Sequence, residues 1–540
     1  MKKLKKFNFL EGAFIATFCI IVSKILGIIY VIPFYNIIGE KGGTLYGYAY
    51  NIYNILLIIS SAGIPFAISK ITSEYHTLGM EDKKNRMYTI ANKIINIFSI
   101  VSFLICFIFA NELARIIIGD LEGGNTIHDV SLVIRLISFA LLIVPRLSVK
   151  RGYLQGHTYI KEPSISQIIE QIVRIIIIIL GSYFCVYIFK LPVKYAVGIS
   201  VFAAFLGALI AYIYLDLKIN HNKKEIGLDK VSKLSKKEDK EIIKKIITCS
   251  IPFIVINLAN TIYTFIDMVL VIRTLPKLGF SAFDTEFISS VFTTWGIKFN
   301  TIVSSVSTGL IISLIPHMVK SYTEKDNAKV NQDFNKCLKI ILFIITPLAI
   351  FISSMSNSMW NFFYRYNEYG PRIIKITILV TVLDCIYMVT NSIMQSIDKR
   401  KMVYVSVSLG LFLNLVFDII LMNLFYKLNI PAYYGAICAT LIGFLISDTI
   451  SLLFLNKEMK LNYKETIKTI PRFILSIIIL VLSLKLCKSF LPISSNSKII
   501  QLGNLLVAGL ISGSIYLFTN FDNVISVMPE KILNKFKKNK

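Results

Sequence analysis

Long apolar stretches alternate with short polar segments along the whole chain. A helix needs about 20 apolar residues to cross the hydrocarbon core of a bilayer, and each stretch is about that long or longer. The pattern therefore predicts an all-α, multi-pass membrane protein. We expect fourteen transmembrane helices, at residues 12–38, 46–71, 88–110, 130–149, 163–189, 193–216, 246–274, 287–316, 337–357, 373–396, 403–425, 433–455, 470–490 and 499–519.

Composition and charge agree with this class. Hydrophobic residues make up 55% of the 540 residues and the mean hydropathy is +0.67, which exceeds what a soluble surface tolerates. The formal net charge is +26, but the Lys and Arg residues gather in alternate loops and in the tail, residues 531–540. Because cytoplasmic loops are rich in Lys and Arg, the charge indicates a topology with both termini in the cytoplasm, and no nucleic-acid partner.

The chain lacks the motifs of an enzyme or of a structural metal centre. Its eight cysteines form no C-x-x-C pair, and its histidines form no H-E-x-x-H. A phosphate-binding G-x-x-x-x-G-K-[ST] loop and a G-x-S-x-G elbow are also missing from the sequence. We therefore expect no catalytic residue and no cofactor.

The longest loop divides the chain into parts. Residues 1–216 hold six spans, residues 217–245 form a basic cytoplasmic linker, residues 246–456 hold six further spans, and residues 457–540 hold the last two spans and the basic tail. A six plus six plus two arrangement is typical of the internal duplication in secondary transporters. A short internal repeat supports it, because Leu154-Gln155-Gly156 and Met394-Gln395-Ser396 both follow the fourth span of their half.

Several spans carry a cation in their middle, namely Lys24, Arg135 and Lys298. An unpaired cation at the bilayer centre costs about 2.5 to 3.5 kcal/mol on insertion scales, so each needs a water-filled cavity or a partner. In the eighth span, polar residues share one helical face with Lys298, at positions Thr294, Thr301, Ser305 and Thr308. Pairing with a nearby Asp for packing is the alternative, and we favour a cavity that accepts a negatively charged substrate.

The fifth span opens with a polar face made of Gln167, Glu170, Gln171 and Arg174. Glu170 and Arg174 are spaced i, i+4 in the favourable order for an ion pair. Their place near the cytoplasmic end favours a structural brace of an inner gate over a substrate contact. Arg151, in the preceding loop, has two interpretations: it collects anionic substrate at this mouth, or it is an ordinary positive-inside residue.

An acidic set lies in the second half of the chain. Asp267 lies deep in the seventh span, Asn414 and Asp418 are spaced i, i+4 in the eleventh, and Thr440 lies in the twelfth. Carboxylate, amide and hydroxyl oxygens suit Na⁺, and the carboxylates suit proton exchange. The equally weighted alternative is that Asp267 pairs with Arg273 and Asp418 makes a polar contact between helices. Asp384 and Asp448 are additional candidates.

Three segments resemble the polysaccharide transporter and stage V sporulation protein B family of the multidrug/oligosaccharidyl-lipid/polysaccharide (MOP) exporter superfamily, and within it the Gram-positive MurJ-type lipid II flippases. They are Ser23-Lys24-Ile25-Leu26-Gly27, Ser61-Ala62-Gly63-Ile64-Pro65 through Ser69-Lys70, and Arg151-Gly152-Tyr153-Leu154-Gln155-Gly156-His157 with Pro163 and Ser166 to Arg174. The resemblance implies a MATE-like fold, with two six-helix lobes around a central cavity and two C-terminal helices beside a groove for a lipid tail.

The resemblance also implies residue roles. Its cavity cations match Lys24, Lys70 and Lys298, and its sodium site matches Asp267, Asn414, Asp418 and Thr440. Many relatives carry Arg where this chain has Lys24, which argues against bidentate phosphate binding at that position.

We therefore expect a bacterial plasma-membrane flippase that moves undecaprenyl-diphosphate sugars, lipid II first among them, by alternating access. Its partners would be the lipid-linked substrate, the bilayer and the cell-wall synthesis machinery, with Na⁺ or H⁺ as the coupling ion. The alternatives are export of another lipid-linked polysaccharide repeat, a drug/cation antiporter of the same superfamily, and a non-transporting scaffold for wall or spore-coat synthesis.

Overall fold

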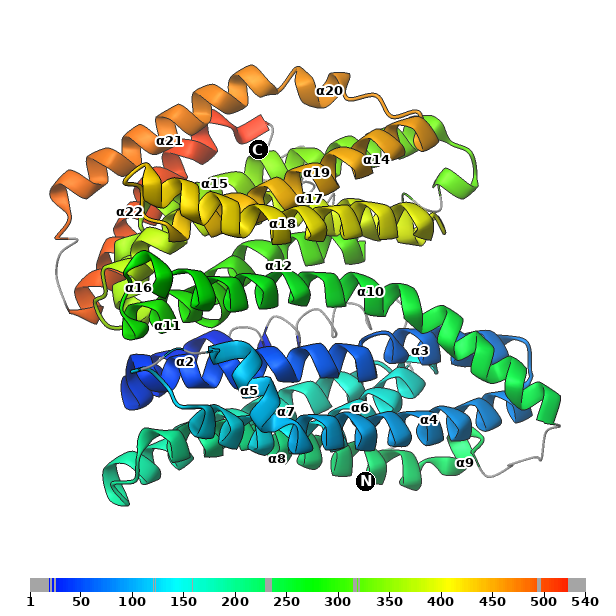
Figure 1. The fold of residues 1–540 in the computed structure, drawn as a ribbon. Coiled ribbons are helices and arrows are strands. Elements are labelled where there is room, and N and C mark those ends of the chain that lie inside the picture. The colour runs from blue at the N-terminus through cyan, green and yellow to red at the C-terminus, as the bar shows by residue number, and fades with distance from the viewer. Residues whose placement is uncertain are drawn as a thin grey trace. The chain divides into compact units, whose positions relative to one another are not determined.

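A computed structural model describes residues 26–522 apart from 120, 122, 158, 229–235, 314–317, 319–320 and 493–496, together with residues 19, 22 and 23. Every regular element in this part of the chain is a helix (Figure 1). An all-helical protein satisfies its backbone hydrogen bonds within each segment, which a bilayer requires. The chain forms two compact units, residues 1–290 and 291–540.

The first unit contains ten labelled α-helices. They are α2 (Val31–Leu57), α3 (Ile64–Thr77), α4 (Glu81–Ile108), α5 (Ala110–Ile118), α6 (Ile127–Gly156), α7 (Lys161–Tyr183), α8 (Val193–His221), α9 (Lys223–Ile226), α10 (Lys236–Thr274) and α11 (Ala282–Ser290). The π-helical turn η1 (Ile58–Ala62) lies between α2 and α3, and the π-helical turn η2 (Phe184–Ile188) extends α7. A short 3₁₀ turn, η3 (Pro276–Leu278), follows α10.

The second unit begins with the π turn η4 (Val291–Trp295), and a further π turn, η5 (Ile341–Ile345), joins two of its helices. Its α-helices are α12 (Ile297–Ser313), α14 (Asn327–Ile340), α15 (Thr346–Ser354), α16 (Ser356–Phe363), α17 (Tyr369–Ser396), α18 (Arg400–Lys427), α19 (Tyr433–Met459), α20 (Lys464–Ile467), α21 (Ile470–Phe490) and α22 (Lys498–Thr519).

Ten helical segments among the described residues are long and apolar enough to cross a membrane. They correspond to the third to sixth and the ninth to fourteenth expected spans, and they confirm an all-helical membrane protein. The expected spans 12–38 and 287–316 extend into residues outside the described ranges. The expected span 46–71 is divided by η1, and the expected span 246–274 lies within α10. The total of fourteen therefore stays a prediction.

Helix α2 contains the junction between the first two expected spans. Gly39 has φ of 65° and interrupts the helix there. A positive φ is costly for residues with a Cβ atom, which is why glycine occupies this bend. The bend follows residue 38, where the sequence predicts the end of the first span.

Two glycines of the family-like motif bring α6 against α3. A Cβ atom on Gly152 would lie 2.5 Å from the carbonyl oxygen of Pro65, and one on Gly156 would lie 2.6 Å from that of Ser69. Gly152 and Gly156 are one turn apart, so they present a smooth face to the backbone of α3. Two of the segments that carry the resemblance are therefore packed directly on each other.

The segment expected to be a cytoplasmic linker is helical over much of its length. Helix α8 continues to His221, α9 follows, and α10 begins at Lys236. The start of α4 holds this segment: the ammonium of the buried Lys84 donates to the carbonyl of Ile226 at 3.0 Å, and Arg86 Nε donates to Asp239 at 2.8 Å. The hydrogen bond from Arg86 lowers the pKa of the Asp239 carboxyl below its usual value.

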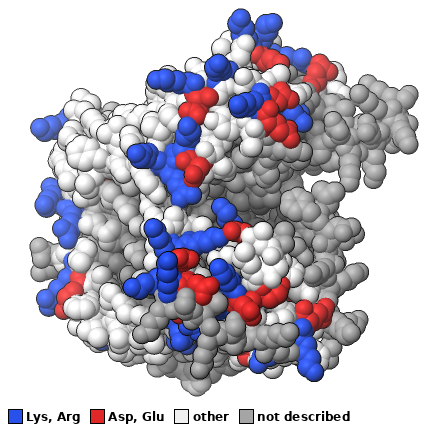
Figure 2. All heavy atoms as spheres, turned by 90° about the vertical axis from the view of Figure 1, so that its right-hand side faces the viewer, with Lys and Arg blue, Asp and Glu red and all other residues white. Residues whose placement is uncertain are grey.

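Charged side chains are frequent on the face drawn in Figure 2, which is the right-hand side of Figure 1. The starts of α4 and α10 lie on that side in Figure 1. Membrane proteins carry their charged groups outside the hydrocarbon, so this face is compatible with a membrane surface. The sequence places the same segments on the cytoplasmic side.

The boundary between the two compact units lies after residue 290, whereas the expected lobes are separated by the linker at residues 217–245. Helix α10, which holds the expected seventh span, contacts α2, α3, α4 and α5 and belongs to the unit of residues 1–290. The compact units do not test internal duplication, so the arrangement of two related six-span halves and a final pair of spans remains a prediction.

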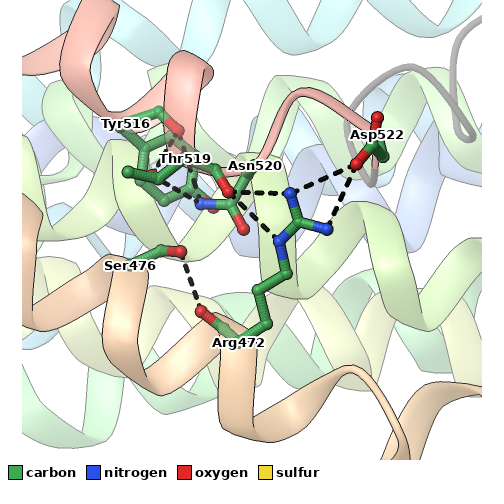
Figure 3. Close-up of polar contacts among 6 residues, drawn as sticks. All are labelled: Arg472, Ser476, Tyr516, Thr519, Asn520 and Asp522. Carbon is green, nitrogen blue, oxygen red and sulfur yellow. Dashed lines mark hydrogen bonds and ion pairs between the residues drawn. The ribbon is translucent and has the colours of Figure 1, made fainter.

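The last two long helices, α21 and α22, pack on each other and on α15 and α16. The Tyr516 hydroxyl donates to the carbonyl of Phe343 at 3.1 Å. At one end of the pair, the Arg472 guanidinium donates to the carbonyl of Thr519 at 3.0 Å and to Asp522 (Figure 3). These contacts hold α22 against the other helices of the second unit. Many exposed side chains of α21 and α22 are large and hydrophobic.

Candidate functional site

The polar face of α7 is tied to the end of α6 by one shared carboxylate. Glu170 accepts from Arg151 at 2.9 Å and from Arg174 at 3.1 Å, and these three side chains are only 14%, 15% and 19% exposed. Arg151 also donates to the Ser166 hydroxyl at 2.8 Å. The expected pair of Glu170 and Arg174 is confirmed, and Arg151 joins it from another helix.

Tyrosines of α2 extend this cluster. The hydroxyls of Tyr30 and Tyr46 are 3.2 Å apart, and the rings of Tyr46 and Tyr50 are 4.4 Å apart. Arg174 interacts electrostatically with Tyr50 and Tyr53. The i, i+4, i+7 spacing of Tyr46, Tyr50 and Tyr53 places the three side chains on one helical face. This spacing is visible in the sequence and could have predicted the tyrosine cluster.

The other two residues of the expected polar face also lie in α7. A Cβ atom on Gly27 would lie 3.3 Å from the amide nitrogen of Gln171, so the first expected span approaches α7 closely. Gln167 is partly buried. The first unit therefore gathers Gln171, Glu170, Arg174 and the tyrosines into one polar interior.

The expected diphosphate ligands are spread over the chain. Lys24 lies outside the described residues, and Lys70 is exposed on α3. Arg135 of α6 donates to Asn111 at 3.5 Å. Arg135 is about 25 Å along α6 from Gly152, which contacts α3, because a helix rises about 1.5 Å per residue. Lys70 and Arg135 are therefore not brought together in the first unit.

Lys298 belongs to the second unit. It is partly buried in α12, one residue after the helix begins at Ile297. On the same helix Thr301 and Ser305 turn their hydroxyls back onto carbonyls of the preceding turn, at 2.9 and 2.6 Å. The polar face expected for this span is thus composed of hydroxyls that are satisfied within the helix, with Lys298 as its charge.

Helices α18 and α19 bring two of the four expected ion ligands, Asn414 and Thr440, into contact. Asn414 donates to the Thr440 hydroxyl at 3.2 Å, and Asn414 and Asp418 are fully buried. The helices approach closely, since a Cβ atom on Gly435 would lie 2.4 Å from the backbone nitrogen of Met422. Asp267 lies in the first unit, where it is 9% exposed.

These residues suit a hard monovalent cation by their chemistry. Within the described ranges no group of three or more His, Cys, Asp and Glu side chains gathers as a metal site. A cation here would therefore rely on amide and hydroxyl oxygens as well as carboxylates, which is the donor set of Asn414, Asp418 and Thr440. Arg273, the alternative partner of Asp267, donates to the carbonyl of Ile116 at 3.0 Å.

Asp384 of α17 and Asp448 of α19 lie near each other on two helices that are in contact. Asp448 is 4% exposed. The Cys385 thiol lies beside both. The structure thus brings these two candidates near each other, which their positions in the sequence did not indicate.

A buried carboxylate that the sequence analysis missed joins three elements of the first unit. Glu286 of α11 is 3% exposed and accepts two hydrogen bonds of 2.9 Å from Asn125, one from its backbone and one from its side chain. Asn125 also donates to the carbonyl of Lys41 at 3.3 Å. These residues are 161 positions apart in the sequence, so local spacing gave no signal of the contact.

The fold and its buried polar interior define a multi-pass helical membrane protein. The chain belongs to the polysaccharide biosynthesis protein family, whose model matches residues 9–307. The MatE family model matches residues 252–420. These are transporters of the MOP superfamily and not enzymes.

Individual relatives support this membership. The chain is 28% identical over 522 residues to the "Lipid II flippase MurJ" of Bacillus subtilis (strain 168), which covers 95% of each chain. Two solved structures share the fold at 14% identity. One is titled "Lipid II flippase MurJ, inward closed conformation", with a TM-score of 0.64 over 94% of this chain and 99% of that one. The other is an inward-facing multidrug resistance MATE family transporter, with a TM-score of 0.65 over 81% and 94%.

Proposed function

We propose that this chain is a flippase that moves undecaprenyl-diphosphate-linked sugars, lipid II in particular, from the inner to the outer leaflet of the bacterial plasma membrane. The carrying observation is the end-to-end similarity to a lipid II flippase, at 28% identity over 95% of both chains. The flippase structure also matches 94% of this chain, against 81% for the multidrug transporter. This difference in coverage favours the flippase over the drug/cation antiporter.

The proposed path for the headgroup is a hydrated cavity between two lobes of six helices, with fourteen helices in all and both termini in the cytoplasm. Lys24, Lys70, Lys298 and Arg135 hold the diphosphate at successive points along the path. A diphosphate and its sugars cannot cross hydrocarbon unaided, because transferring charged and polar groups out of water is costly. The cations offset that cost, and the lipid tail stays in the bilayer.

The polar face of α7 and the neighbouring Arg151 have another role in this proposal. Arg151, Glu170 and Arg174, with Gln167 and Gln171, brace the end of the first unit that is expected at the cytoplasmic mouth. Their mutual hydrogen bonds support this role, since Glu170 satisfies two guanidinium groups.

The driving ion in the proposal is Na⁺, held by Asp267, Asn414, Asp418 and Thr440, with H⁺ as the second candidate. Support comes from the hydrogen bond between Asn414 and Thr440 and from the complete burial of Asp418. Replacing Na⁺ by choline should slow the return of the empty transporter if this site couples ion entry to transport.

The decisive experiment is depletion of all other flippases in a bacterium that expresses this chain. Lipid II in the outer leaflet is measured by its cleavage with an added, membrane-impermeant hydrolase. We expect outer-leaflet lipid II with the wild-type chain and its loss with Lys298→Ala at equal protein level. The exposed Lys427 at the end of α18 supplies the matched control, Lys427→Ala, which should behave as wild type.

Other outcomes separate the rivals. A scaffold for wall or spore-coat synthesis would support growth with Lys298→Ala, because it needs no charge in a cavity. An exporter of another lipid-linked repeat would leave lipid II in the inner leaflet and move its own substrate. Either result would overturn lipid II transport as the function.

A further inference from the structure

The second unit contains a cationic cavity. It has a volume of about 230 Å³ and lies where α15 meets α16, beside the start of α17 and the last turn of α21. Ser354, Ser356, Asn357, Arg372, Lys375 and Lys488 line it together with Pro371. Three of these side chains are cations, and none is an acid.

Two of the three cations have no acidic partner within the described part of the chain. Arg372 pairs with Glu368 at 2.8 Å. Lys375 and Lys488 make no ion pair there, and each lies within electrostatic range of the other. Like charges repel each other, and an anion bound between them would relieve that repulsion. The arrangement therefore suits a negatively charged ligand.

A larger polar cavity of about 540 Å³ adjoins the cationic one and shares Asn357, Pro371 and Arg372 with it. Three asparagines line it, Asn357, Asn361 and Asn367, together with Tyr366. Its one acid is Glu368, which pairs with Arg372. Asn361 is only 7% exposed, and its amide oxygen has no hydrogen-bond partner among the described residues. A buried amide without a partner is costly, and amide groups both donate to and accept from hydroxyls. This cavity is suited to a ligand rich in hydroxyl groups.

The same place adjoins an apolar surface. Leu491 and Pro492, directly after α21, line the larger cavity. Along α21 most of the exposed side chains are aliphatic, at 59% exposure for Leu475, 59% for Leu482 and 62% for Leu486, and Arg472 and Lys485 are its exposed charges. Because Lys488 lies in the last turn of α21, the aliphatic helix leads directly to the cationic cavity, and the polar cavity adjoins the cationic one. A lipid-linked sugar has the matching parts, a tail joined to phosphates and phosphates joined to a sugar.

We propose that Lys375 and Lys488 bind the phosphate groups of a lipid-linked sugar, whose sugar occupies the adjoining polar cavity. The tail would lie in the lipid groove that the family resemblance already implies beside the two C-terminal helices. This inference rests on the proposed function and adds a second binding site to it. In the expected topology the start of α17 and the end of α21 lie on the outer side, so the site holds the lipid after its headgroup has crossed.

The test is a binding measurement on the full-length protein in nanodiscs of neutral phosphatidylcholine. Lipid II is titrated into the wild type and into Lys375→Gln/Lys488→Gln. Lysine binds phosphate as a point charge, and glutamine keeps similar bulk without that charge. We expect two binding phases in the wild type, and we expect the double variant to lose affinity at least tenfold in one of them while the central site keeps the other. Lys427→Gln should bind as the wild type does. Unchanged thermal unfolding of both variants confirms that they are folded.

Competing probes identify the ligand class. Inorganic pyrophosphate should displace lipid II weakly and only where both lysines are present, which supports the phosphate contact. Displacement by phosphatidylglycerol as effective as by lipid II assigns the cavity to ordinary anionic lipid and overturns the sugar-lipid assignment. Equal affinity of the wild type and the double variant overturns the site altogether.

Failure of this site is distinguishable from failure of the proposed function. If the wild type flips lipid II and the double variant binds it equally well, flippase activity stands and the second site is refuted. If the wild type does not flip lipid II but its binding still depends on Lys375 and Lys488, the site stands and the proposed function is refuted.

Discussion

Removing the carboxylate of Glu170 should destabilise the protein strongly. In Glu170→Ala, Arg151 and Arg174 lose their shared acceptor while they remain 15% and 19% exposed. Breaking a buried ion pair by removing one partner costs about 3–5 kcal/mol, because the remaining charge stays buried. We expect the low end of this range, about 3 kcal/mol, because Arg151 keeps its hydrogen bond to Ser166.

The measurement is the free energy of unfolding in mixed micelles, followed as the denaturing detergent is increased. A matched control is available in the chain, since Glu368 and Arg372 form another i, i+4 pair at 2.8 Å with 59% and 53% exposure. An exposed pair is worth about 0–1 kcal/mol, so Glu368→Ala should cost less than about 1 kcal/mol.

A double-mutant cycle then divides the effect between the two arginines. Arg174→Ala and Arg151→Ala are each combined with Glu170→Ala, and both pairs should show favourable coupling. If Glu170→Ala costs no more than Glu368→Ala, the brace is refuted. A brace also predicts that the folded fraction of the variant still transports, whereas a substrate contact predicts loss of transport in folded molecules.

Three further predictions concern other contacts. Gly156→Ala should cost about 1–3 kcal/mol of unfolding free energy, because the new Cβ would lie 2.6 Å from Ser69 and Thr72. The control Gly503→Ala should be neutral, because nothing lies within 4 Å of its new Cβ. Equal effects of the two substitutions would contradict the tight contact of α6 and α3. Glu286→Ala should speed amide hydrogen exchange at Asn125, and unchanged exchange would show that this carboxylate does not fix the segment. Asp418→Asn should abolish any dependence of transport on Na⁺, and a Na⁺ dependence equal to that of the wild type would exclude Asp418 as a ligand.

Local patterns in the sequence predicted local features of the structure. Apolar stretches located the ten long helices, because a bilayer selects for length and composition of each segment independently. The pair of Glu170 and Arg174 was also predictable from local sequence, because residues spaced i, i+4 lie next to each other on one helix. Gly39 at the end of the first expected span was also consistent with a bend.

Contacts between distant segments were not predictable from spacing. Arg151 reaches Glu170 from another helix, and Asn125 reaches Glu286 across 161 residues. Lys375 and Lys488 are an exposed and a half-buried lysine near the outer ends of two expected spans, and no local spacing in the sequence relates them. Only the packing of α17 and α21 around one cavity gives them a common role.

The pairing of each charge separates brace residues from ligand residues more sharply than its position in a span does. Arg151 and Arg174 lie where an anionic substrate would be expected to enter, yet Glu170 already neutralises them, so a phosphate would have to displace a buried carboxylate. Lys375 and Lys488 require no such displacement, because within the described chain they have only each other. A phosphate gains both cations there without breaking an ion pair, and this difference is why we assign the anion to the cavity beside α21 and the structural role to Glu170.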